Sequence, residues 1–425
     1  MIDIRIIRDN PDHVKKNYLK RREPKLIKLV DKVRKKDKQW RKQLQLLEKL
    51  NQKRNTISTK VPELKGKDKK EKIKEVKEVK EKIDKKKEKV DKLKEQRDKL
   101  MKKLPNLIHE SVPYGKSDED NVPIKHWGKK RNKYKPRSHV DILKEYGLAD
   151  LEAAAKVSGA RFYYLKGDLV KLDYALQQYA MDFLENKGFT LIEPPYMIRR
   201  KPYEGVTDLA DFEDVMYKVE GEDLYLIATS EHPIAAMHMD KTFFEQDELP
   251  LKYAGISACF RKEAGAHGKD TKGIFRVHRF NKVEQFVFCK PENSWKIFEE
   301  LRKNKEGIFQ SLGIPYRVVN ICTGDLGIVA AKKYDIEGWF PVQGKYRELT
   351  SGSNCTDWQA RRLNIKYVNS EREKEYVHTL NCTGIATSRA MVAIIENFQE
   401  KDGTIKIPKV LWKYTGGLKK IKKKK

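Results

Sequence analysis

Apolar residues recur every seven positions through the first quarter of the chain, and this repeat limits the possible folds more than any other feature. One run ends before Pro62 and Gly66, and a second run follows them. Two such runs separated by a Pro/Gly break favour an antiparallel hairpin of paired helices. The first run contains Leu26, Val30, Val33, Trp40, Leu44 and Leu47, and the second contains Val76, Val79, Ile83, Val90, Leu93, Leu100 and Leu104. With about 35 residues in each helix, we expect an arm roughly 50 Å long that projects from a globular body.

Positive charge is concentrated in the same region. The 425 residues include 92 basic and 62 acidic side chains, which gives a net charge of +30. Residues 1–140 hold 47 basic and 22 acidic side chains, whereas the remaining 285 residues hold 45 and 40. This asymmetry indicates a polyanionic partner, most often a nucleic acid. A solvated, lysine-rich helix surface is the alternative, and composition alone does not separate the two.

The composition becomes globular from about His139, after a connector rich in proline and glycine. Strands are predicted at 190–192, 224–227, 256–260, 283–288 and 316–321, and helices at 172–184, 232–239, 292–312 and 388–397. Clustered strands favour an antiparallel α+β domain over a doubly wound sheet. The predicted organisation is an N-terminal domain at 1–112 with the arm at about 26–104, a connector at 113–138, a globular domain at 139–415 and a lysine-rich tail at 416–425.

Several classes of protein are disfavoured by what the sequence lacks. The five cysteines form no C-x-x-C pair, so neither a disulfide scaffold nor a zinc site is expected. Charge appears within the first five residues and no apolar run approaches about 20 residues, so we expect no signal peptide, no membrane span and a cytoplasmic protein. There is no P-loop or dinucleotide-binding glycine motif. A bound nucleotide would therefore have its phosphates held by side chains.

One predicted hairpin brings suitable side chains together. Phe260–Glu263 ends a strand, residues 264–273 form a loop with three glycines, and a second strand is expected from Ile274. Arg261 and Glu263 would share a face of this hairpin, with Phe275 and Arg276 on the opposing strand. Arginines neutralise phosphate, an aromatic ring stacks on a base, and a carboxylate accepts from an exocyclic amine. A surface ion-pair ladder is the alternative interpretation.

Longer motifs extend this set. The segments that carry a resemblance are Lys187–Phe189 through Pro195, Phe260–Glu263 with Ile274–His278, Gly384–Arg389 continuing to Asn397, Thr229–Glu231, and Arg347–Asn354 leading into Asp357–Arg362. In their order from Met1 to about Thr415 they resemble the seryl-tRNA synthetase family, class II aminoacyl-tRNA synthetases, in its archaeal and eukaryotic cytosolic form. The heptad hairpin resembles the tRNA-binding arm of that family.

The resemblance implies a role for each site residue. ATP would be bound by Arg261, Lys262, Glu263, Phe275, Arg276, Val277, Glu348, Leu349, Thr350, Ser351 and Arg389, with Arg261, Arg276 and Arg389 as the catalytic residues. Serine would be bound by Thr229, Ser230, Glu231, Arg261, Glu284 and Thr383. Within these sets, Glu348 and Ser351 would hold Mg²⁺. Glu231 and Thr229 would hold the amino group of serine, and Glu284 and Thr383 its hydroxyl.

The implied activity is the ATP-dependent attachment of L-serine to tRNA(Ser) by a homodimer, through seryl-adenylate, with release of AMP and pyrophosphate. Whether tRNA(Sec) is also charged stays open. Neither step needs a protein nucleophile, so His267 and His278 are not expected to act as bases. A catalytically silent relative would usually have lost Arg261, Arg389 or Glu348, and all three are present.

Two positions depart from the family pattern, and the tail has two interpretations. Thr350 stands where serine is common, and Arg279 where glutamine is common. The lysines of the tail form either an additional tRNA-binding strip or a disordered solubilising end.

Overall fold

The computed structural model describes residues 1–130, 136–207, 215–244, 249–263 and 272–423. The chain divides into two compact units, residues 1–107 and 108–425. In these described ranges no helix combines the length and the apolar character that crossing a membrane requires.

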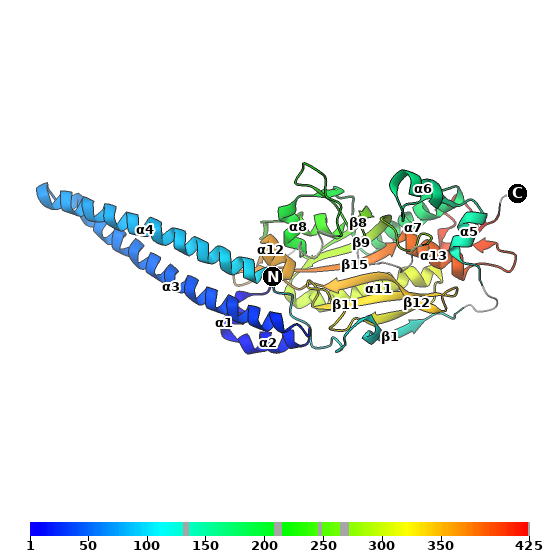
Figure 1. Ribbon diagram of the computed structural model, residues 1–425, viewed down its shortest axis with the longest axis horizontal. Helices are drawn as coiled ribbons and strands as arrows, with labels where there is room; N and C mark the ends of the chain where they lie inside the picture. Colours follow the sequence, from blue (N-terminus) through cyan, green and yellow to red (C-terminus); the bar gives the residue numbers. More distant parts are fainter. Residues whose placement is uncertain (131–135, 208–214, 245–248, 264–271, 424–425) are drawn as a thin grey trace. The chain divides into compact units, whose positions relative to one another are not determined.

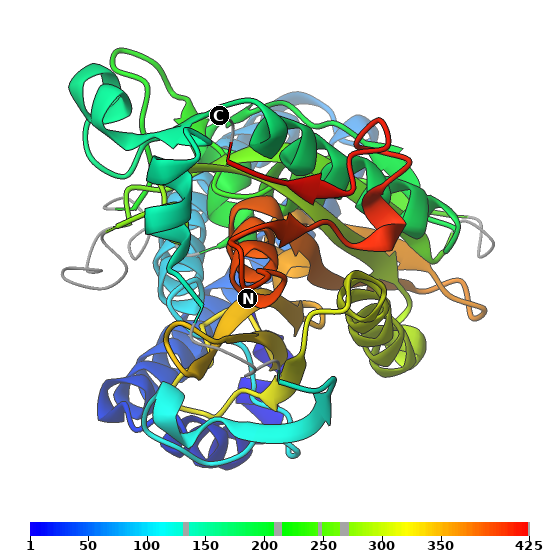
Figure 2. The ribbon, with the colours of Figure 1, turned by 90° about the vertical axis from the view of Figure 1, so that its right-hand side faces the viewer.

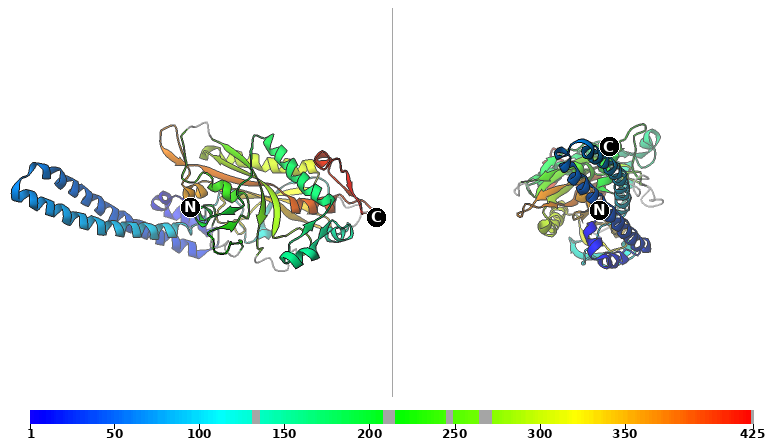
Figure 3. Two further views of the ribbon diagram at one scale, coloured as in Figure 1. Left: turned by 90° about the horizontal axis from the view of Figure 1, so that it is seen from above. Right: turned by 90° about the vertical axis from the view of Figure 1, so that its left-hand side faces the viewer.

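The first unit is helical and contains the predicted hairpin. Its elements are α1 (Ile4–Asp9), α2 (Pro11–Leu19), α3 (Pro24–Lys60), the 3₁₀ turn Val61–Glu63 and α4 (Gly66–Met101). The helices α3 and α4 lie side by side as an antiparallel pair (Figures 1 and 3). The break between them falls at Pro62 and Gly66, as predicted, because proline cannot continue a helix and Gly66 adopts a φ of 61°.

A buried carboxylate interrupts the apolar seam of the hairpin. Asp37 occupies the heptad position between Val30 and Leu44, and it is 1% exposed. Its oxygens lie 2.7 Å from Arg8 Nη2 of α1, 3.0 Å from Arg41 Nε and 3.4 Å from Arg97 Nη1 of α4. Burial alone would raise the pKa of Asp37, but the neighbouring arginines, led by Arg8, hold it below its ordinary value. Asp37 therefore stays ionised and joins α1, α3 and α4.

An eight-stranded sheet dominates the second unit. Its order is β1-β10-β11-β12-β15-β9-β8-β4, and every neighbouring pair is antiparallel except β4 with β8. The strands are β1 (Val122–Trp127), β4 (Thr190–Ile192), β8 (Leu251–Phe260), β9 (Arg279–Cys289), β10 (Tyr316–Asn320), β11 (Lys332–Phe340), β12 (Lys345–Asn354) and β15 (His378–Ala386). The expected antiparallel α+β fold is confirmed.

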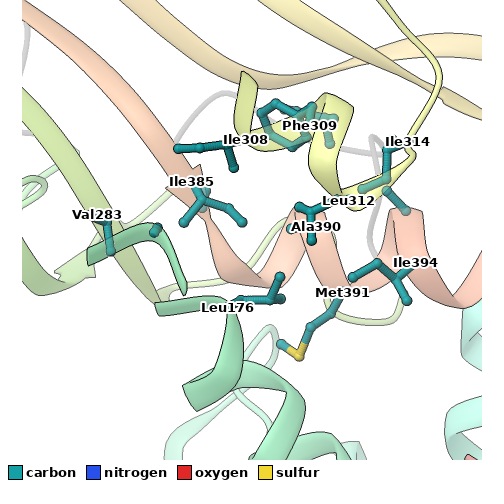
Figure 4. Packing of buried hydrophobic residues seen from close by; sticks show 14 of the residues in the cluster. Leu176, Val283, Ile308, Phe309, Leu312, Ile314, Ile385, Ala390, Met391 and Ile394 are labelled. Carbon is teal, nitrogen blue, oxygen red and sulfur yellow. The ribbon is translucent and has the colours of Figure 1, made fainter. Parts of the chain in front are cut away.

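Helices cover both faces of this sheet. One face packs on α7 (Asp168–Glu185), α11 (Ser294–Leu312) and α13 (Thr387–Asn397), which can be followed in Figure 2. Figure 4 shows part of the resulting apolar core, to which Ile308 and Phe309 of α11, Ile385 of β15 and Met391 of α13 all contribute. Phe286 and Phe288 of β9 belong to a second cluster, with α8 (Arg200–Val206), α10 (Glu231–Ala236) and α12 (Trp358–Leu363).

A β-bulge at Gly384 changes the face of the sheet to which the following side chains of β15 point. Thr383 pairs with Glu284 of β9, but Ile385 pairs with its neighbour Val283, so Gly384 is the extra residue. A Cβ at Gly384 would lie 3.2 Å from the Val283 carbonyl oxygen, which favours glycine there. After the bulge, Ile385 enters the core that contains α13.

Smaller elements complete the unit. They are α5 (His139–Glu145), β2 (Ala149–Asp150), α6 (Leu151–Ser158), β3 (Tyr164–Leu165), β5 (Met197–Ile198), β6 (Tyr225–Leu226), β7 (Thr242–Phe243), β13 (Lys366–Val368), β14 (Lys374–Tyr376), β16 (Ile405–Lys406) and β17 (Lys420–Ile421).

Two segments carry more structure than the sequence suggested. Residues 113–138, expected to be a connector, contribute β1 to the large sheet. The lysine-rich tail contributes β17, which pairs with β16 and buries Ile421 completely. A wholly disordered tail is therefore wrong, because Ile421 joins the main core.

Candidate active site

A cavity of about 490 Å³ opens in the second unit. Fourteen of the sixteen residues predicted for the site line it, namely Thr229, Glu231, Arg261, Glu263, Phe275, Arg276, Val277, Glu284, Glu348, Leu349, Thr350, Ser351, Thr383 and Arg389. The two others do not: Ser230 is buried with its Oγ 3.4 Å from the Gly255 carbonyl, and Lys262 is exposed with its ammonium 5.9 Å from the Tyr217 ring.

The predicted hairpin around Arg261 is wrong in detail. β8 ends at Phe260 and β9 begins only at Arg279, so Arg261, Glu263 and Ile274–His278 lie outside both strands. Glu263 adopts a φ of 51°, which breaks the strand alternation that the sequence reasoning assumed. The connection is still closed, because the Arg261 amide donates to the His278 carbonyl at 2.9 Å and His278 Nδ1 lies 2.7 Å from the Arg261 carbonyl oxygen. His278 thus orients the backbone of Arg261.

One part of the cavity presents an aromatic ring among arginines. The guanidinium of Arg389 lies 5.2 Å from the centroid of Phe275, and that of Arg347 lies 4.7 Å from it. Arg276 Nη1 pairs with Glu263 Oε2 at 2.7 Å. Cationic groups and a flat ring together suit a nucleotide, since arginine binds phosphate and the ring stacks on a base.

A carboxylate on β12 faces the same group of cations. Arg389 Nη1 lies 3.2 Å from Glu348 Oε1 and donates to the Glu348 carbonyl at 3.1 Å. Partial shielding from water would raise the pKa of Glu348, but the charges of Arg389, Lys333 and Arg261 lower it to about 2. The Glu348 side chain is 48% exposed in this setting. It is an ionised ligand available to the cavity.

These groups fit a magnesium ion. Ser351 pairs with Asp335 of β11 in the sheet register, and the Oδ1 atom of Asp335 has no hydrogen-bond partner among the described residues. An ionised carboxylate and a hydroxyl beside phosphate-binding arginines are the oxygen ligands that Mg²⁺ takes together with substrate phosphates. Among the described residues, no three His, Cys, Asp or Glu side chains gather into a metal-binding group.

The other part of the cavity is a connected polar cluster. Thr383 Oγ1 donates to Glu284 Oε2 at 2.8 Å, across the register pair of β15 and β9. Lys282 Nζ lies 2.5 Å from the same oxygen and donates to Thr229 Oγ1 at 2.7 Å. Nearby, Glu231 Oε1 accepts from Asn381 Nδ2 at 3.0 Å and from Gln359 Nε2 at 3.2 Å.

Electrostatics set the protonation of this cluster. Burial raises the pKa of Glu231 to about 7, assisted by the charge of Glu284 and opposed by Lys282, Gln359 and Arg261. Burial lowers the pKa of His232 to about 3, with Lys282 and Arg261 acting in the same direction. Neutral His232 is edge-on to Tyr203, with 4.8 Å between ring centroids.

Sequence reasoning missed several cavity residues. Lys282, Lys333 and Asn381 line the cavity. Lys282 stands two residues before Glu284 on β9, and Asn381 two residues before Thr383 on β15, so the two-residue period of a strand places each on the face of a predicted residue. That periodicity was the available signal.

The two departures from the family pattern have separate surroundings. Thr350 is buried, and its hydroxyl has no hydrogen-bond partner within the described ranges. Burial raises the pKa of Tyr163 and of Asp173, and the charge of Arg279 opposes both shifts. His267 and most of the glycine-containing loop lie outside the described residues.

Known proteins match the chain along both units. Residues 1–108 match the seryl-tRNA synthetase N-terminal domain, and residues 215–398 match the tRNA synthetase class II core domain (G, H, P, S and T). The serine–tRNA ligase of Pyrococcus abyssi is 55% identical over 98% of this chain and 96% of its own. The one from Archaeoglobus fulgidus is 56% identical over 97% of this chain and 95% of its own.

Solved structures agree with these matches. The seryl-tRNA synthetase from Pyrococcus horikoshii, complexed with ATP, has a TM-score of 0.94 and 52% identity, with both chains covered completely. The cytoplasmic serine–tRNA ligase from Naegleria fowleri, in complex with AMP, has a TM-score of 0.90 and 42% identity over 100% of this chain and 99% of that one.

Proposed function

Because this chain belongs to the seryl-tRNA synthetase family of class II aminoacyl-tRNA synthetases, it attaches serine to tRNA(Ser) with ATP, and we propose which parts of its cavity carry the reaction. In the first step the serine carboxylate attacks the α-phosphorus of ATP and pyrophosphate leaves. In the second, a hydroxyl of the terminal ribose of tRNA attacks the seryl carbonyl and AMP leaves.

The proposal rests on Arg261, which lines the cavity together with residues of both of its parts. Its charge lowers the pKa of Glu231 on one side and of Glu348 on the other. A guanidinium there can bind the serine carboxylate and the α-phosphate together, which aligns the two reacting groups. Arg261 would also stabilise the charge that develops on the α-phosphoryl oxygens.

The polar cluster suits serine. Glu231 and Thr229 would bind the ammonium group, and Glu284 with Thr383 would bind the hydroxyl. A site built to hydrogen-bond a hydroxyl rejects alanine, because the buried Glu284 and Thr383 would lose their substrate partner. Threonine would be excluded by lack of room.

The arginine-rich part suits the nucleotide. Phe275 would stack on adenine, Glu263 would accept from its amine, and Arg276 and Arg389 would bind the outer phosphates. Glu348 and Ser351 would hold Mg²⁺, which neutralises phosphate charge when it is bound.

Unit 1 would bind the tRNA through the basic hairpin of α3 and α4. We further propose a homodimer, tested by its mass in solution, and action in the cytoplasm, where translation consumes the seryl-tRNA product. Charging of tRNA(Sec) would be tested with that transcript beside tRNA(Ser).

ATP–pyrophosphate exchange with serine, alanine and threonine tests the proposed reaction. Exchange should depend on serine, with alanine and threonine disfavoured by orders of magnitude. Exchange supported equally by alanine would contradict the hydroxyl assignment, and no serine-dependent exchange would contradict the enzyme.

A further inference from the structure

Lys282 is a buried lysine in the cavity wall that has no role in the reaction described above. Its side chain is 7% exposed, and it lies on β9. A lysine is rarely buried without a partner, because removing its charge from water is costly. Here the ammonium contacts Glu284 Oε2 at 2.5 Å and Thr229 Oγ1 at 2.7 Å.

The two partners of Lys282 belong to the two ends of the proposed serine site. Thr229 stands beside Glu231, on the side of the ammonium group, and its Oγ1 accepts from the Glu231 amide at 3.2 Å. Glu284 is on the side of the hydroxyl. No other side chain in the described part of the chain hydrogen-bonds both Thr229 and Glu284. Lys282 therefore bridges the two ends of the proposed serine site.

The contacts of Lys282 also decide which oxygen of Glu284 meets the substrate. Thr383 and Lys282 both engage Oε2. Within the described ranges, Oε1 has no hydrogen-bond donor and is left to accept from a substrate hydroxyl. A carboxylate held by two donors on one oxygen cannot rotate freely, so the position of the other oxygen is fixed.

Lys282 has a second effect, which is to compensate the negative charge of Glu284. Serine binds as a zwitterion, so Arg261 and Glu231 would be matched by its carboxylate and ammonium. Glu284 then remains as an unmatched negative charge in the cavity, and Lys282 supplies the opposite charge. The Lys282 ammonium also lowers the pKa of Glu231, whereas Glu284 raises it.

We propose that Lys282 is a positioning residue for serine selection, which fixes the spacing between the ammonium-binding and hydroxyl-binding groups and balances the charge of Glu284. This inference rests on the proposed function, because it assumes that the polar cluster binds serine. The substrate class it selects is a small α-amino acid with a β-hydroxyl.

The experiment measures exchange kinetics for the full-length protein and its variants from pH 6 to 9. Lys282→Met removes the charge at similar length, and Lys282→Arg keeps the charge but changes the geometry. Lys252→Met is the matched control, since Lys252 lies on the neighbouring strand β8, pairs with Glu300 of α11 at 2.7 Å and does not line the cavity. Lys333→Met alters the cavity near Glu348 and should affect ATP instead of serine.

Lys282→Met should raise the KM for serine about tenfold or more, the size of effect typical of a hydrogen bond to a charged group. The KM for ATP should stay within about twofold, selectivity for serine over alanine should fall, and the acid limb of kcat/KM for serine should move to higher pH. Lys282→Arg should lose selectivity but keep the acid limb in place, because the charge remains.

Three results would overturn the inference: an unchanged KM for serine in Lys282→Met, equal increases for serine and ATP, or an unmoved acid limb. If Lys282→Met does not fold, the selectivity of Lys282→Arg for serine over alanine is the test: a loss supports the inference, and unchanged selectivity overturns it. Wild-type protein without serine-dependent exchange would instead refute the proposed function, so the two failures are distinguishable.

Discussion

At the scale of single residues, Arg261 is proposed to bind both the serine carboxylate and the α-phosphate of ATP. Replacing it with alanine should reduce ATP–pyrophosphate exchange by about 10²-fold or more, as expected when one electrostatic donor to a developing charge is lost. The fold should survive, because the Arg261 side chain faces the cavity and its Nε makes one long hydrogen bond, 3.3 Å to the Ala228 carbonyl.

Arg372→Ala is the matched control for that variant, since Arg372 is an exposed residue in the turn between β13 and β14. Both proteins should give the same far-ultraviolet circular dichroism. Near-normal exchange in a folded Arg261→Ala protein would refute the role of Arg261.

The raised pKa of Glu231 predicts that kcat/KM for serine depends on pH. With a pKa of about 7 it is protonated at lower pH and cannot pair with the serine ammonium. The value of kcat/KM for serine should therefore fall about tenfold for each pH unit below about 7, as for one essential base in the free enzyme. Glu231→Gln should have a low, flat profile over this range, and an acid limb that persists in this variant would assign the titration to another group.

The residues that sequence reasoning found and missed have physical reasons. Arginine, phenylalanine and glutamate in a short segment can be recognised by their chemistry in any conformation, so Arg261, Glu263 and Phe275 were found although they lie outside the strands of the predicted hairpin. Lys282 has no such distinctive chemistry in a lysine-rich chain, and its place two residues before Glu284 on β9 was its one signal. Its role depends on burial beside Glu284, and burial comes from tertiary packing.

At the scale of elements, the lysine-rich tail contributes to the stability of the second unit. Ile421 is fully buried, Lys420 Nζ lies 3.6 Å from Glu400 Oε2, and Lys423 Nζ lies 3.3 Å from Glu145 Oε1. Replacing Ile421 with alanine should cost about 2–5 kcal/mol of stability, since a core cavity forms. Thermal unfolding measures this cost.

Lys422→Ala is the control for the tail, because Lys422 is exposed and should change stability by no more than about 0.5 kcal/mol. Equal unfolding temperatures for Ile421→Ala and the wild type would mean that β17 is not a stable part of the unit.

The helical hairpin was predicted because heptad periodicity is local, while three central strands were missed. β11, β12 and β15 carry Asp335, Glu348 and Asn381 within the sheet, and such polar residues hide a strand when only apolar runs are sought. β15 does alternate Thr379, Asn381 and Thr383 with Leu380 and Cys382, so its period was present. The ion cluster at Asp37 could not be foreseen, because Arg8 and Arg97 reach it from distant positions.

At the scale of the whole molecule, the two units predict a division of labour. Every residue assigned to ATP or serine lies in the second unit, and the excess positive charge lies in the first 140 residues. Replacing residues 48–81 with a short flexible linker removes the distal hairpin but keeps the contacts of Asp37 with Arg8, Arg41 and Arg97. Exchange should persist, whereas aminoacylation should fall strongly.

A salt series separates the causes of that loss. Lysines that neutralise tRNA phosphates release counterions, so aminoacylation by the intact protein should weaken steeply with salt and the truncated protein should respond less. Equal loss of exchange and aminoacylation in a well-folded truncation would contradict the division. Unchanged aminoacylation would mean that the distal hairpin does not bind the tRNA.

The bulge at Gly384 has a consequence for how such a catalyst can diversify. Upstream of it, Thr379, Asn381 and Thr383 contact the polar cluster; downstream, α13 carries Arg389 toward Glu348. The change of face occurs at the extra residue. Side chains that precede Gly384 can therefore be substituted without rotating α13, which follows it. The residues proposed to recognise the amino acid thus lie before the bulge and Arg389 lies after it, so a new amino acid preference could arise while the nucleotide-binding groups stay in place.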